Sequence, residues 1–266
     1  MKKKSSLLLP ILGTLLVFML MSSETKPNED LTGQNTTSIY EENNKTMAVD
    51  KENTSRFIQT KLFQKEEGNY EIFYRYPFLD PKFNPSFKVF NDFIRNEYLD
   101  LDNSVRNILN ETELPCHVGY DKLERMKRVV DYKIYTIDDH MLSILMYKAN
   151  HYTDKKQNSY LFKTLNFDME KGQFLSYDSV FKPGSEWSVL KQLNRLLEKK
   201  VNAEPKYEEC SQLTPSTFEA YKNNFVIDKT SIKFYFDDCV ICPVYSGNYF
   251  IEIPKSQVSE WLIIKA

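Results

Sequence analysis

The stretch that decides the fold reads Asn224-Phe225-Val226-Ile227-Asp228 and Ile232-Lys233-Phe234-Tyr235-Phe236, and after Cys242-Pro243 and Gly247 it ends with Tyr249-Phe250-Ile251-Glu252-Ile253-Pro254. Runs of β-branched and aromatic residues bounded by Asn, Asp, Pro and Gly are typical of short β-strands. A short amphipathic segment through Val258, Trp261 and Leu262 follows. The end of the chain is therefore predicted to contain three strands.

The same strand pattern occupies the middle of the chain. Residues 129–137, 140–152 and 159–168 are rich in β-branched and aromatic residues, and each run is followed by turn-forming residues. Three consecutive strands with short connections predict an antiparallel meander. Further strands are expected at 57–63 and 70–76, and a short extended piece at 173–181. Pro77, Pro81 and Pro85 are expected to stop any regular element between the early strands and the first helix.

Two segments have helical periodicity. Residues 86–101 carry an aromatic and aliphatic stripe, with Ser86 as the expected N-cap, and residues 186–199 carry a leucine face opposite charged residues. A short helical turn is expected at 215–221. Strands and helices are segregated along the chain rather than alternating. We therefore predict an α+β fold in which one antiparallel sheet, the meander plus the C-terminal strands, packs against the apolar faces of two main helices.

The N-terminus predicts export. Lys2, Lys3 and Lys4 precede an apolar run from Leu7 to Met21, which fits a signal peptide or signal anchor over residues 1–23. Residues 24–55 are polar and have few large apolar side chains, which is typical of a disordered tether. Residues 56–266 are expected to form a single α+β domain. The expected location is periplasmic or extracellular, with contact to a membrane only through the N-terminal segment where it stays uncleaved.

Four cysteines lie in the expected domain: Cys116, Cys210, Cys239 and Cys242. An even number in an exported chain favours disulfides. If the strand continues extended from Cys239 to Cys242, their Cα atoms lie roughly 10 Å apart, whereas a disulfide needs about 7 Å or less. These two cysteines are then expected to pair with Cys116 and Cys210. A tight turn before Pro243 would instead let Cys239 and Cys242 bond to each other.

A metal site is the alternative interpretation of the cysteines. Cys239-x-x-Cys242 has zinc-ligand spacing, and the chain contains three histidines, His117, His140 and His151. A zinc ribbon needs a second closely spaced pair of ligands, and the sequence has none. We therefore expect disulfides, no metal and no cofactor.

Two motifs resemble a known family. Asn166-Phe167-Asp168-x-x-x-Gly172 and Leu175-Ser176-Tyr177-Asp178-Ser179-Val180-Phe181 are similar to the signature of RsiV-type extracellular domains. These combine two bacterial domains of unknown function found in a lysozyme-sensing anti-sigma factor and in a peptidoglycan deacetylase. The resemblance divides the domain into a first half at about 56–125 and a second half at about 126–266. It implies a ligand-sensing or accessory module standing alone.

The chain departs from this family in two loops. The family's Gly-Gly-Ala-His turn is replaced by Tyr152-Thr153-Asp154-Lys155-Lys156, and its Tyr-Glu step by Cys239-Val240. We predict that these loops form a recognition edge. Its candidate binding residues are Tyr152, Asp154, Lys155, Tyr245 and Gly247. The alternative explanation is that the sequences of these loops have changed without any functional consequence.

Catalysis is not expected. Asp138-Asp139-His140 and Asp237-Asp238 could supply acid–base groups, but both stand where a strand ends, and Asp is favoured there by turn geometry alone. The chain has no phosphate-binding glycine loop, G-x-S-x-G elbow or H-E-x-x-H motif. Its net charge of −2 and lack of a basic stripe also make nucleic acid an unexpected partner.

Two functions are compatible with these observations. The first is an exported cell-envelope binding or sensing module that recognises a protein such as lysozyme or a cell-wall glycan. The second is a structural or accessory envelope domain that only partners another membrane protein. Exposure of the loop aromatics Tyr152, Tyr245 and Tyr249 would favour the first, and their burial would favour the second.

Overall fold

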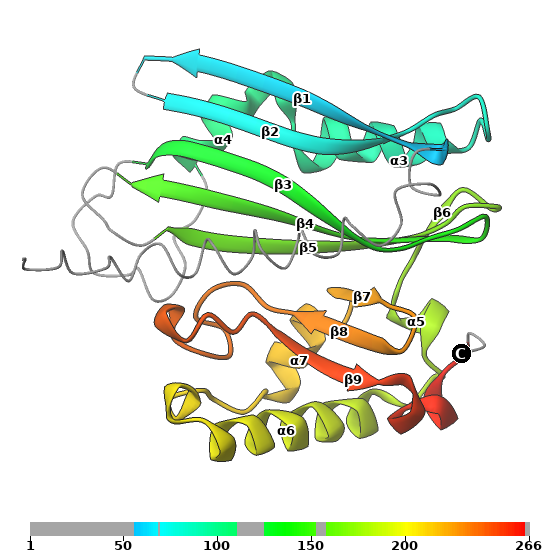
Figure 1. Ribbon diagram of the computed structural model, residues 1–266, viewed down its shortest axis with the longest axis vertical. Coiled ribbons are helices and arrows are strands. Elements are labelled where there is room, and N and C mark those ends of the chain that lie inside the picture. Colours follow the sequence, from blue (N-terminus) through cyan, green and yellow to red (C-terminus); the bar gives the residue numbers. More distant parts are fainter. Residues whose placement is uncertain (1–55, 69, 111–124, 153–157, 264–266) are drawn as a thin grey trace, which may run out of the picture. The chain divides into compact units, whose positions relative to one another are not determined.

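The computed structural model describes residues 56–68, 70–110, 125–152 and 158–263. The expected signal segment and tether, together with Cys116, Asp154 and Lys155, therefore lie outside the described residues. Within the described ranges no helix is both long enough and apolar enough to cross a membrane. The described elements form two β-sheets with helices packed on each of them (Figure 1).

The larger sheet has six strands in sequence order: β1 (Ile58–Glu67), β2 (Tyr70–Leu79), β3 (Arg125–Ile137), β4 (Met141–Tyr152), β5 (Ser159–Asp168) and β6 (Gln173–Leu175). The predicted meander is confirmed as the antiparallel run β3–β4–β5. One pair was not expected, since β2 and β3 run parallel. A parallel pair needs a long crossover, and the connection from Leu79 to Arg125 provides it.

The C-terminal strands form a sheet of their own, so the prediction of one sheet was wrong. β7 (Phe225–Ile227), β8 (Ser231–Tyr235) and β9 (Phe250–Pro254) are antiparallel, with β8 in the middle. Helix α6 (Glu186–Ala203) runs along this sheet (Figure 1). Its buried residues Val189, Leu190, Leu193 and Leu197 share a core with the strands. α7 (Pro215–Tyr221) packs into the same core through Phe218. The α+β class is confirmed.

Residues 173–181 are not one extended piece. The strand β6 ends at Leu175, and α5 (Tyr177–Val180) follows with Ser176 as its N-cap. The side chains of Ser176 and Ser179 form a capping box, which satisfies backbone N–H groups at the start of the helix. Tyr177 and Phe181 are fully buried and stack on each other. The second family-like motif therefore caps the short helix α5 and contributes two aromatic rings to the core.

The helix predicted at 86–101 is broken into shorter pieces. α3 (Phe87–Asp92) is followed by a π-helical turn (Phe93–Tyr98), a 3-10 turn (Leu101–Asn103) and α4 (Ser104–Asn110). Asp100 has a left-handed backbone with φ of 43°, which ends the helical run. Its carboxylate accepts hydrogen bonds from the side-chain amides of Asn103 and Asn107. Ser86 occupies the N-cap position of α3, as predicted, but its side chain makes no capping hydrogen bond.

The strand β2 continues through Pro77 to Leu79, contrary to the expected stop. β3 pairs only with residues 71–74 of β2, so the later part of β2 has a strand on one side only. Proline is tolerated where its missing N–H would face no partner strand. Beyond β2 the chain turns back, and Asn91 fixes the return with two hydrogen bonds to the backbone of Leu79.

The two sheets meet at the edge of β5. On the side of β5 away from β4, strand β6 pairs only with residues 166–168, which leaves the earlier part of β5 without a neighbouring strand on that side. The backbone N–H groups of Tyr160, Phe162 and Thr164 donate instead to side-chain oxygens. The acceptors are Asp238 Oδ2 (2.6 Å), Asp237 Oδ1 (2.6 Å) and Asn224 Oδ1 (2.8 Å). Polar side chains from the second sheet thus replace a strand.

The first family-like motif belongs to the same junction. Asn166 donates through its amide to the carbonyl of Phe225 (2.8 Å) and accepts from the hydroxyl of Ser143 (2.6 Å). The same hydroxyl accepts the backbone N–H of Ile227 (2.7 Å). Two of these contacts join strands of the first sheet to β7, and the Ser143–Asn166 bond links the two side chains that make them, so Asn166 has a structural role.

Replacing Phe90 by Ala is expected to lower the free energy of unfolding by about 3–5 kcal/mol. Phe90 is fully buried and packs edge-to-face on Phe167, so the change removes an aromatic contact and leaves a cavity. The control is Val89→Ala on the neighbouring position, whose side chain is 49% exposed; it should change stability by less than about 0.5 kcal/mol. Chemical denaturation measures both, and equal effects would contradict the assigned helix face.

Candidate functional site

The loop from Cys239 to Gly247 is fastened to the body of the second sheet. Cys242 forms a disulfide with Cys210, and the Ser211 N–H donates to the carbonyl of Ile241 (2.8 Å). Cys242 pairs with a distant cysteine, as predicted, and not with Cys239. The assumed extended chain was wrong, because β8 ends at Tyr235 and Cys239 lies in a turn with a φ of 64°. Cys239 is also disulfide-bonded.

The far end of the loop is held by polar contacts. Lys200 of α6 donates from Nζ to Asn248 Oδ1 (2.5 Å) and lies over the rings of Tyr207 and Phe250. Burial lowers the pKa of Lys200. Ser246 donates to the carbonyl of Pro243 (2.8 Å), which closes the turn from within. The loop is therefore attached at both ends and at its middle.

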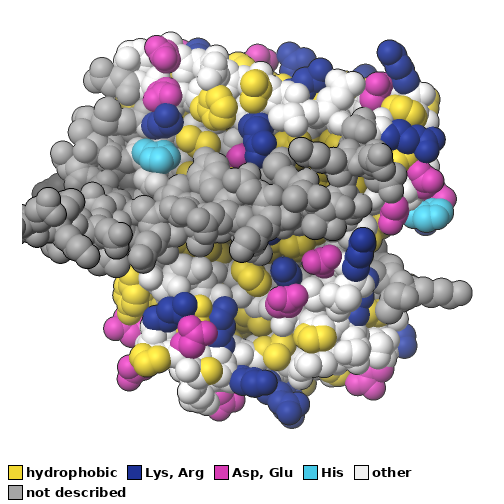
Figure 2. All heavy atoms as spheres, in the orientation of Figure 1, with side chains coloured by type: hydrophobic (Ala, Val, Ile, Leu, Met, Phe, Trp, Pro, Cys, Tyr) yellow, Lys and Arg dark blue, Asp and Glu magenta, His cyan; other side chains and the backbone are white. Residues whose placement is uncertain are grey.

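Tyr245 projects from this fastened loop. Its side chain is 54% exposed, and a hydrogen bond to the Glu209 carboxylate raises the pKa of the Tyr245 hydroxyl. The charge of Glu208 acts in the same direction. Gly247 is exposed and has a positive φ of 62°, which favours glycine at that turn. Acidic, basic and hydrophobic side chains lie close together at this end of the second sheet (Figure 2).

The other residues predicted for the recognition edge are either buried or not described. Tyr249, an expected loop aromatic, is only 7% exposed and packs against Tyr160 and Phe162. Tyr152 is the last residue of β4, opposite Arg125, and its side chain is not among those described. Asp154 and Lys155 lie outside the described residues, so their placement in the recognition edge stays a prediction. Cys116, a disulfide candidate, also lies outside them.

Described residues next to the two predicted loops, 152–156 and Cys239–Gly247, lie in contact with each other. Ser159, at the start of β5, pairs with Asn150 of β4. The next residue, Tyr160, donates its N–H to Asp238 and accepts the Asp238 N–H at its carbonyl (3.1 Å). The base of the Cys239–Gly247 loop therefore lies beside the strand that follows residues 153–157.

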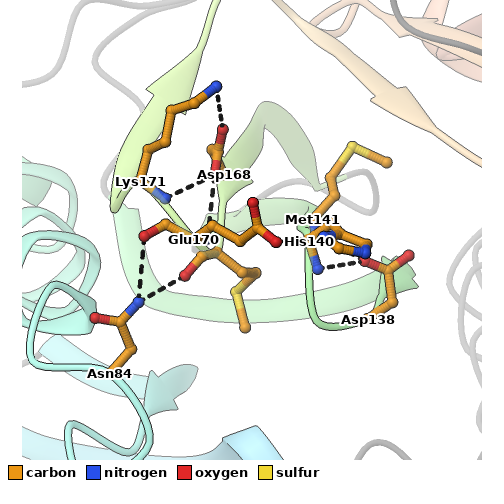
Figure 3. A network of polar contacts seen from close by, with 8 residues as sticks. Asn84, Asp138, His140, Met141, Asp168, Glu170 and Lys171 are labelled. Atoms are coloured by element: carbon orange, nitrogen blue, oxygen red, sulfur yellow. Dashed lines mark hydrogen bonds and ion pairs between the residues drawn. The ribbon is translucent and has the colours of Figure 1, made fainter.

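Asp138, Asp139 and His140 occupy the turn between β3 and β4. Asp138 Oδ1 accepts the backbone N–H groups of His140 and Met141, each at 2.8 Å (Figure 3). This is the turn geometry that the sequence favoured for Asp138. His140 Nδ1 lies 2.7 Å from Glu170 Oε1, and this hydrogen bond raises the pKa of His140.

A second turn completes this network. Asp168 Oδ1 accepts the backbone N–H groups of Glu170 and Lys171, and these contacts lower the pKa of Asp168 (Figure 3). Asn84 donates to the carbonyl of Met169 (2.8 Å), which fixes the loop after β2 to the same turn. The side chains of His140 and Glu170 are 77% and 61% exposed. The network joins three turns at the surface.

Asp237 and Asp238 have structural contacts that sequence reasoning did not identify. Asp237 accepts from the Tyr221 hydroxyl (3.0 Å), and Asp238 is fully buried. Burial, with a smaller effect from the charge of Asp237, raises the pKa of Asp238 to about 7. Asp238 Oδ1 and the Tyr249 hydroxyl are buried without a hydrogen-bond partner among the described residues. The two residues stand at either base of the Cys239–Gly247 loop.

No group of three or more His, Cys, Asp or Glu side chains suited to a metal ion occurs in the part of the chain that the structure describes. The acidic residues beside Tyr245 and the Asn side chains at the junction were missed from the sequence. Asn224 directly precedes a strand, and its position was the one sequence signal for the junction. An Asn side chain there can form hydrogen bonds with backbone groups.

Replacing Asp238 by Asn is expected to flatten the pH dependence of stability. The folded-state pKa near 7 exceeds the unfolded value of about 3.9, so the stabilisation from this carboxyl is complete below about pH 4 and is lost as pH rises through 7. At pH 8 the variant should be on the order of 1–3 kcal/mol more stable than the wild type. Denaturant titrations from pH 4 to 8 test this, with exposed Asp139→Asn as control; parallel curves for all three proteins would contradict it.

Removing the Cys210–Cys242 disulfide is expected to lower the free energy of unfolding by about 3–4 kcal/mol, since it closes a loop across 32 residues. The double variant Cys210→Ser with Cys242→Ser avoids leaving one free thiol. Thermal melting compares it with Ser211→Ala, an exposed neighbour that should melt like the wild type. An unchanged melting temperature in the double variant would show that the bond does not restrain the loop.

Comparison with known proteins adds a family match and a fold match. Residues 178–256, from α5 to the turn after β9, match the family described as "Protein of unknown function (DUF3298)". A DUF3298 family member from Bacteroides fragilis NCTC 9343 has a similar structure, with 14% identity and a TM-score of 0.50, covering 79% of this chain and 95% of that one.

A DUF3298 family protein from Pseudomonas aeruginosa PAO1 is similar to the same degree, with 15% identity and a TM-score of 0.50, covering 77% of this chain and 93% of that one. At these identities the likeness concerns the fold alone. No curated protein matches the chain. The matched region contains Cys210, Cys242 and Tyr245, so the candidate loop lies within a DUF3298-like segment, residues 178–256.

Proposed function

We propose that this chain is an exported, non-catalytic binding or sensing module of the cell envelope. Its ligand is a protein such as lysozyme, or a cell-wall glycan, and the loop Cys239–Gly247 contacts it. The observation that carries the proposal is the exposed ring of Tyr245 on a loop tied down by the Cys210–Cys242 disulfide.

The attachment of the loop supports recognition on energetic grounds. Binding through a flexible loop costs about 0.5–1.5 kcal/mol for each side chain that must be immobilised. Here the disulfide, the Lys200–Asn248 bond and the internal Ser246 bond hold the backbone before any ligand arrives. Tyr is enriched among residues that dominate binding energy, because it offers a large contact area with few rotatable bonds.

The charges around Tyr245 favour a basic protein as the ligand. Glu208 and Glu209 both act on the Tyr245 hydroxyl, so the exposed ring is bordered by two carboxylates. Complementary charge speeds the encounter with a partner and selects against partners of the same sign. Lysozyme is a basic protein and is the ligand that the RsiV-type resemblance implies. A neutral glycan would gain less from these carboxylates.

The covalent chemistry supports export. Disulfides persist in oxidising compartments and are rare in the cytosol, and Cys210–Cys242 is such a bond. The lysine-rich start and apolar run of the sequence fit a secretory segment. The disulfide is compatible with a periplasmic or extracellular location, where a lysozyme or a wall glycan would be met.

One observation favours the alternative function. Tyr249, the second loop aromatic that the structure describes, is buried against Tyr160 and Phe162 instead of facing solvent. A structural or accessory domain that only partners another membrane protein would need no exposed ring on the loop. The exposure of Tyr245 is what separates the two functions.

Binding of the purified full-length protein to hen egg-white lysozyme tests the proposal by calorimetry. Tyr245→Ala is expected to weaken binding at least about tenfold, because it removes the exposed ring at the centre of the contact. The matched control is Trp187→Ala on α6, which removes a ring that is 68% exposed but far from the loop in sequence. The control should bind like the wild type.

The carboxylates give a second readout. Changing Glu208 and Glu209 to Gln together should weaken lysozyme binding and reduce its dependence on salt, since both charges are screened in solution. Binding of peptidoglycan fragments, with no binding of lysozyme, would identify a glycan as the ligand. Binding of neither, or equal affinities for Tyr245→Ala and the wild type, would favour the accessory function.

A further inference from the structure

β1 is the outermost strand of the six-stranded sheet, and within the described ranges no strand pairs with its outer side (Figure 1). The strand is 10 residues long and most of its side chains are exposed, including Leu62 at 64%. A long exposed edge presents a row of backbone N–H and C=O groups to which another strand can pair. This edge therefore has the form of an interaction surface.

The register with β2 indicates which backbone groups face outward. Two residues separate Glu67 from Tyr70, and the residues that close a two-residue hairpin form a hydrogen-bonded pair. Bonded and non-bonded pairs alternate along the strands, so Thr60 and Pro77 form a non-bonded pair, which suits a residue without an N–H. The N–H and C=O groups of the even-numbered residues from Thr60 to Glu66 then face outward.

The charges of β1 distinguish between the ways in which two copies could pair antiparallel about a two-fold axis. An axis through residue 61 or 65 places one lysine opposite its own copy, and an axis through residue 63 places Lys61 opposite Lys65. Like charges directly opposite each other destabilise a strand pair. An axis through residue 62 forms no charge pair. An axis through Gln64 places Lys61 opposite Glu67 of the second copy, and does so twice.

We propose that two copies of this chain associate through antiparallel pairing of their β1 strands, centred on Gln64 and joined by two reciprocal Lys61–Glu67 ion pairs. In the same register Lys65 lies opposite Phe63 of the second copy, where an ammonium and an aromatic ring attract each other. Gln64 is even-numbered, so the central backbone groups face each other and can bond. The six-stranded sheets of the two copies then form one continuous sheet.

The second copy fits this edge better than an arbitrary peptide does. Lysines on an edge strand disfavour pairing with other strands, because their charge is desolvated without compensation. Lys61 and Glu67 are both exposed and on the same face of β1, since they are six residues apart. A strand with the same spacing of opposite charges compensates both, and β1 itself has that spacing. Glu67 would then contact Lys61 of the second copy beside its own Lys65, whose Nζ lies 2.8 Å from the Glu67 carboxylate. This inference does not rest on the proposed function.

Sedimentation velocity of the full-length protein over a wide concentration series tests the proposal. The wild type is expected to dimerise, and Lys61→Glu or Glu67→Lys alone should weaken the dimer at least about tenfold, because each places like charges opposite each other twice. The double variant Lys61→Glu with Glu67→Lys restores opposite charges and should restore the dimer. Lys88→Glu, an exposed lysine on α3, is the control and should dimerise like the wild type.

At concentrations where the wild type is monomeric, all four variants should melt at the wild-type temperature, because the altered side chains are exposed. This separates loss of association from loss of folding. A monomeric wild type would overturn the proposal, and so would a dimer that persists in both single variants, since it would use another surface. Failure of the double variant to dimerise would overturn the Gln64-centred register and with it the proposal.

Discussion

The structure depends on how the open edge of β5 is satisfied. Three successive outward N–H groups of this strand, those of Tyr160, Phe162 and Thr164, would be buried without partners where the second sheet packs against the first. A buried backbone group left unpaired costs on the order of 1–3 kcal/mol. Asn224, Asp237 and Asp238 supply the acceptors, and Asn224 also donates to the carbonyls of Phe162 and Tyr235. One amide side chain thereby bonds to both sheets.

The candidate loop takes its position from this junction. Asp238 directly precedes the loop and Tyr249 follows it after Asn248, and each contacts Tyr160 of the first sheet. The loop therefore begins and ends on residues that are themselves fixed by the packing of the two sheets. Its exposed part is then free to carry Tyr245 without a stabilising role of its own. Burial of Tyr249 and exposure of Tyr245 are two consequences of the same arrangement.

The elements predicted well from the sequence are those set by local patterns. The leucine face of α6 repeats with helical periodicity, so it indicates both the element and its buried side. The long runs of β-branched and aromatic residues in β3–β5, each followed by turn-forming residues, indicate the strands themselves. The pairing of Cys242 with a distant cysteine was predicted correctly, although the chain from Cys239 to Cys242 turns and is not extended as assumed. The Asp138 turn was predicted from the preference of Asp for such sites.

The features that the sequence did not predict depend on contacts between distant segments. Nothing near β2 or β3 indicates that they run parallel, because the pairing is set by the crossover between them. The separate second sheet arises because Asn224 and the two aspartates pair with β5 in place of a strand, and a single Asn or Asp has no periodic signature. The acidic residues beside Tyr245 were missed for the same reason. Glu208 and Glu209 act on that ring from a distant segment, which the Cys210–Cys242 disulfide and the Ser211–Ile241 hydrogen bond join to the loop.

Unpaired backbone N–H and C=O groups need hydrogen-bond partners, and the two edges of the large sheet meet this need in opposite ways. On β5 the unpaired backbone is buried, so short side chains with fixed geometry, Asn and Asp, must bond to it directly. On β1 the unpaired backbone is exposed, so water can satisfy it, and the long charged side chains of Lys61 and Lys65 serve to discourage other strands. A buried edge permits one internal partner and makes it permanent. An exposed edge that carries charged side chains favours a partner strand with opposite charges at the facing positions. Its association is then reversible and depends on concentration.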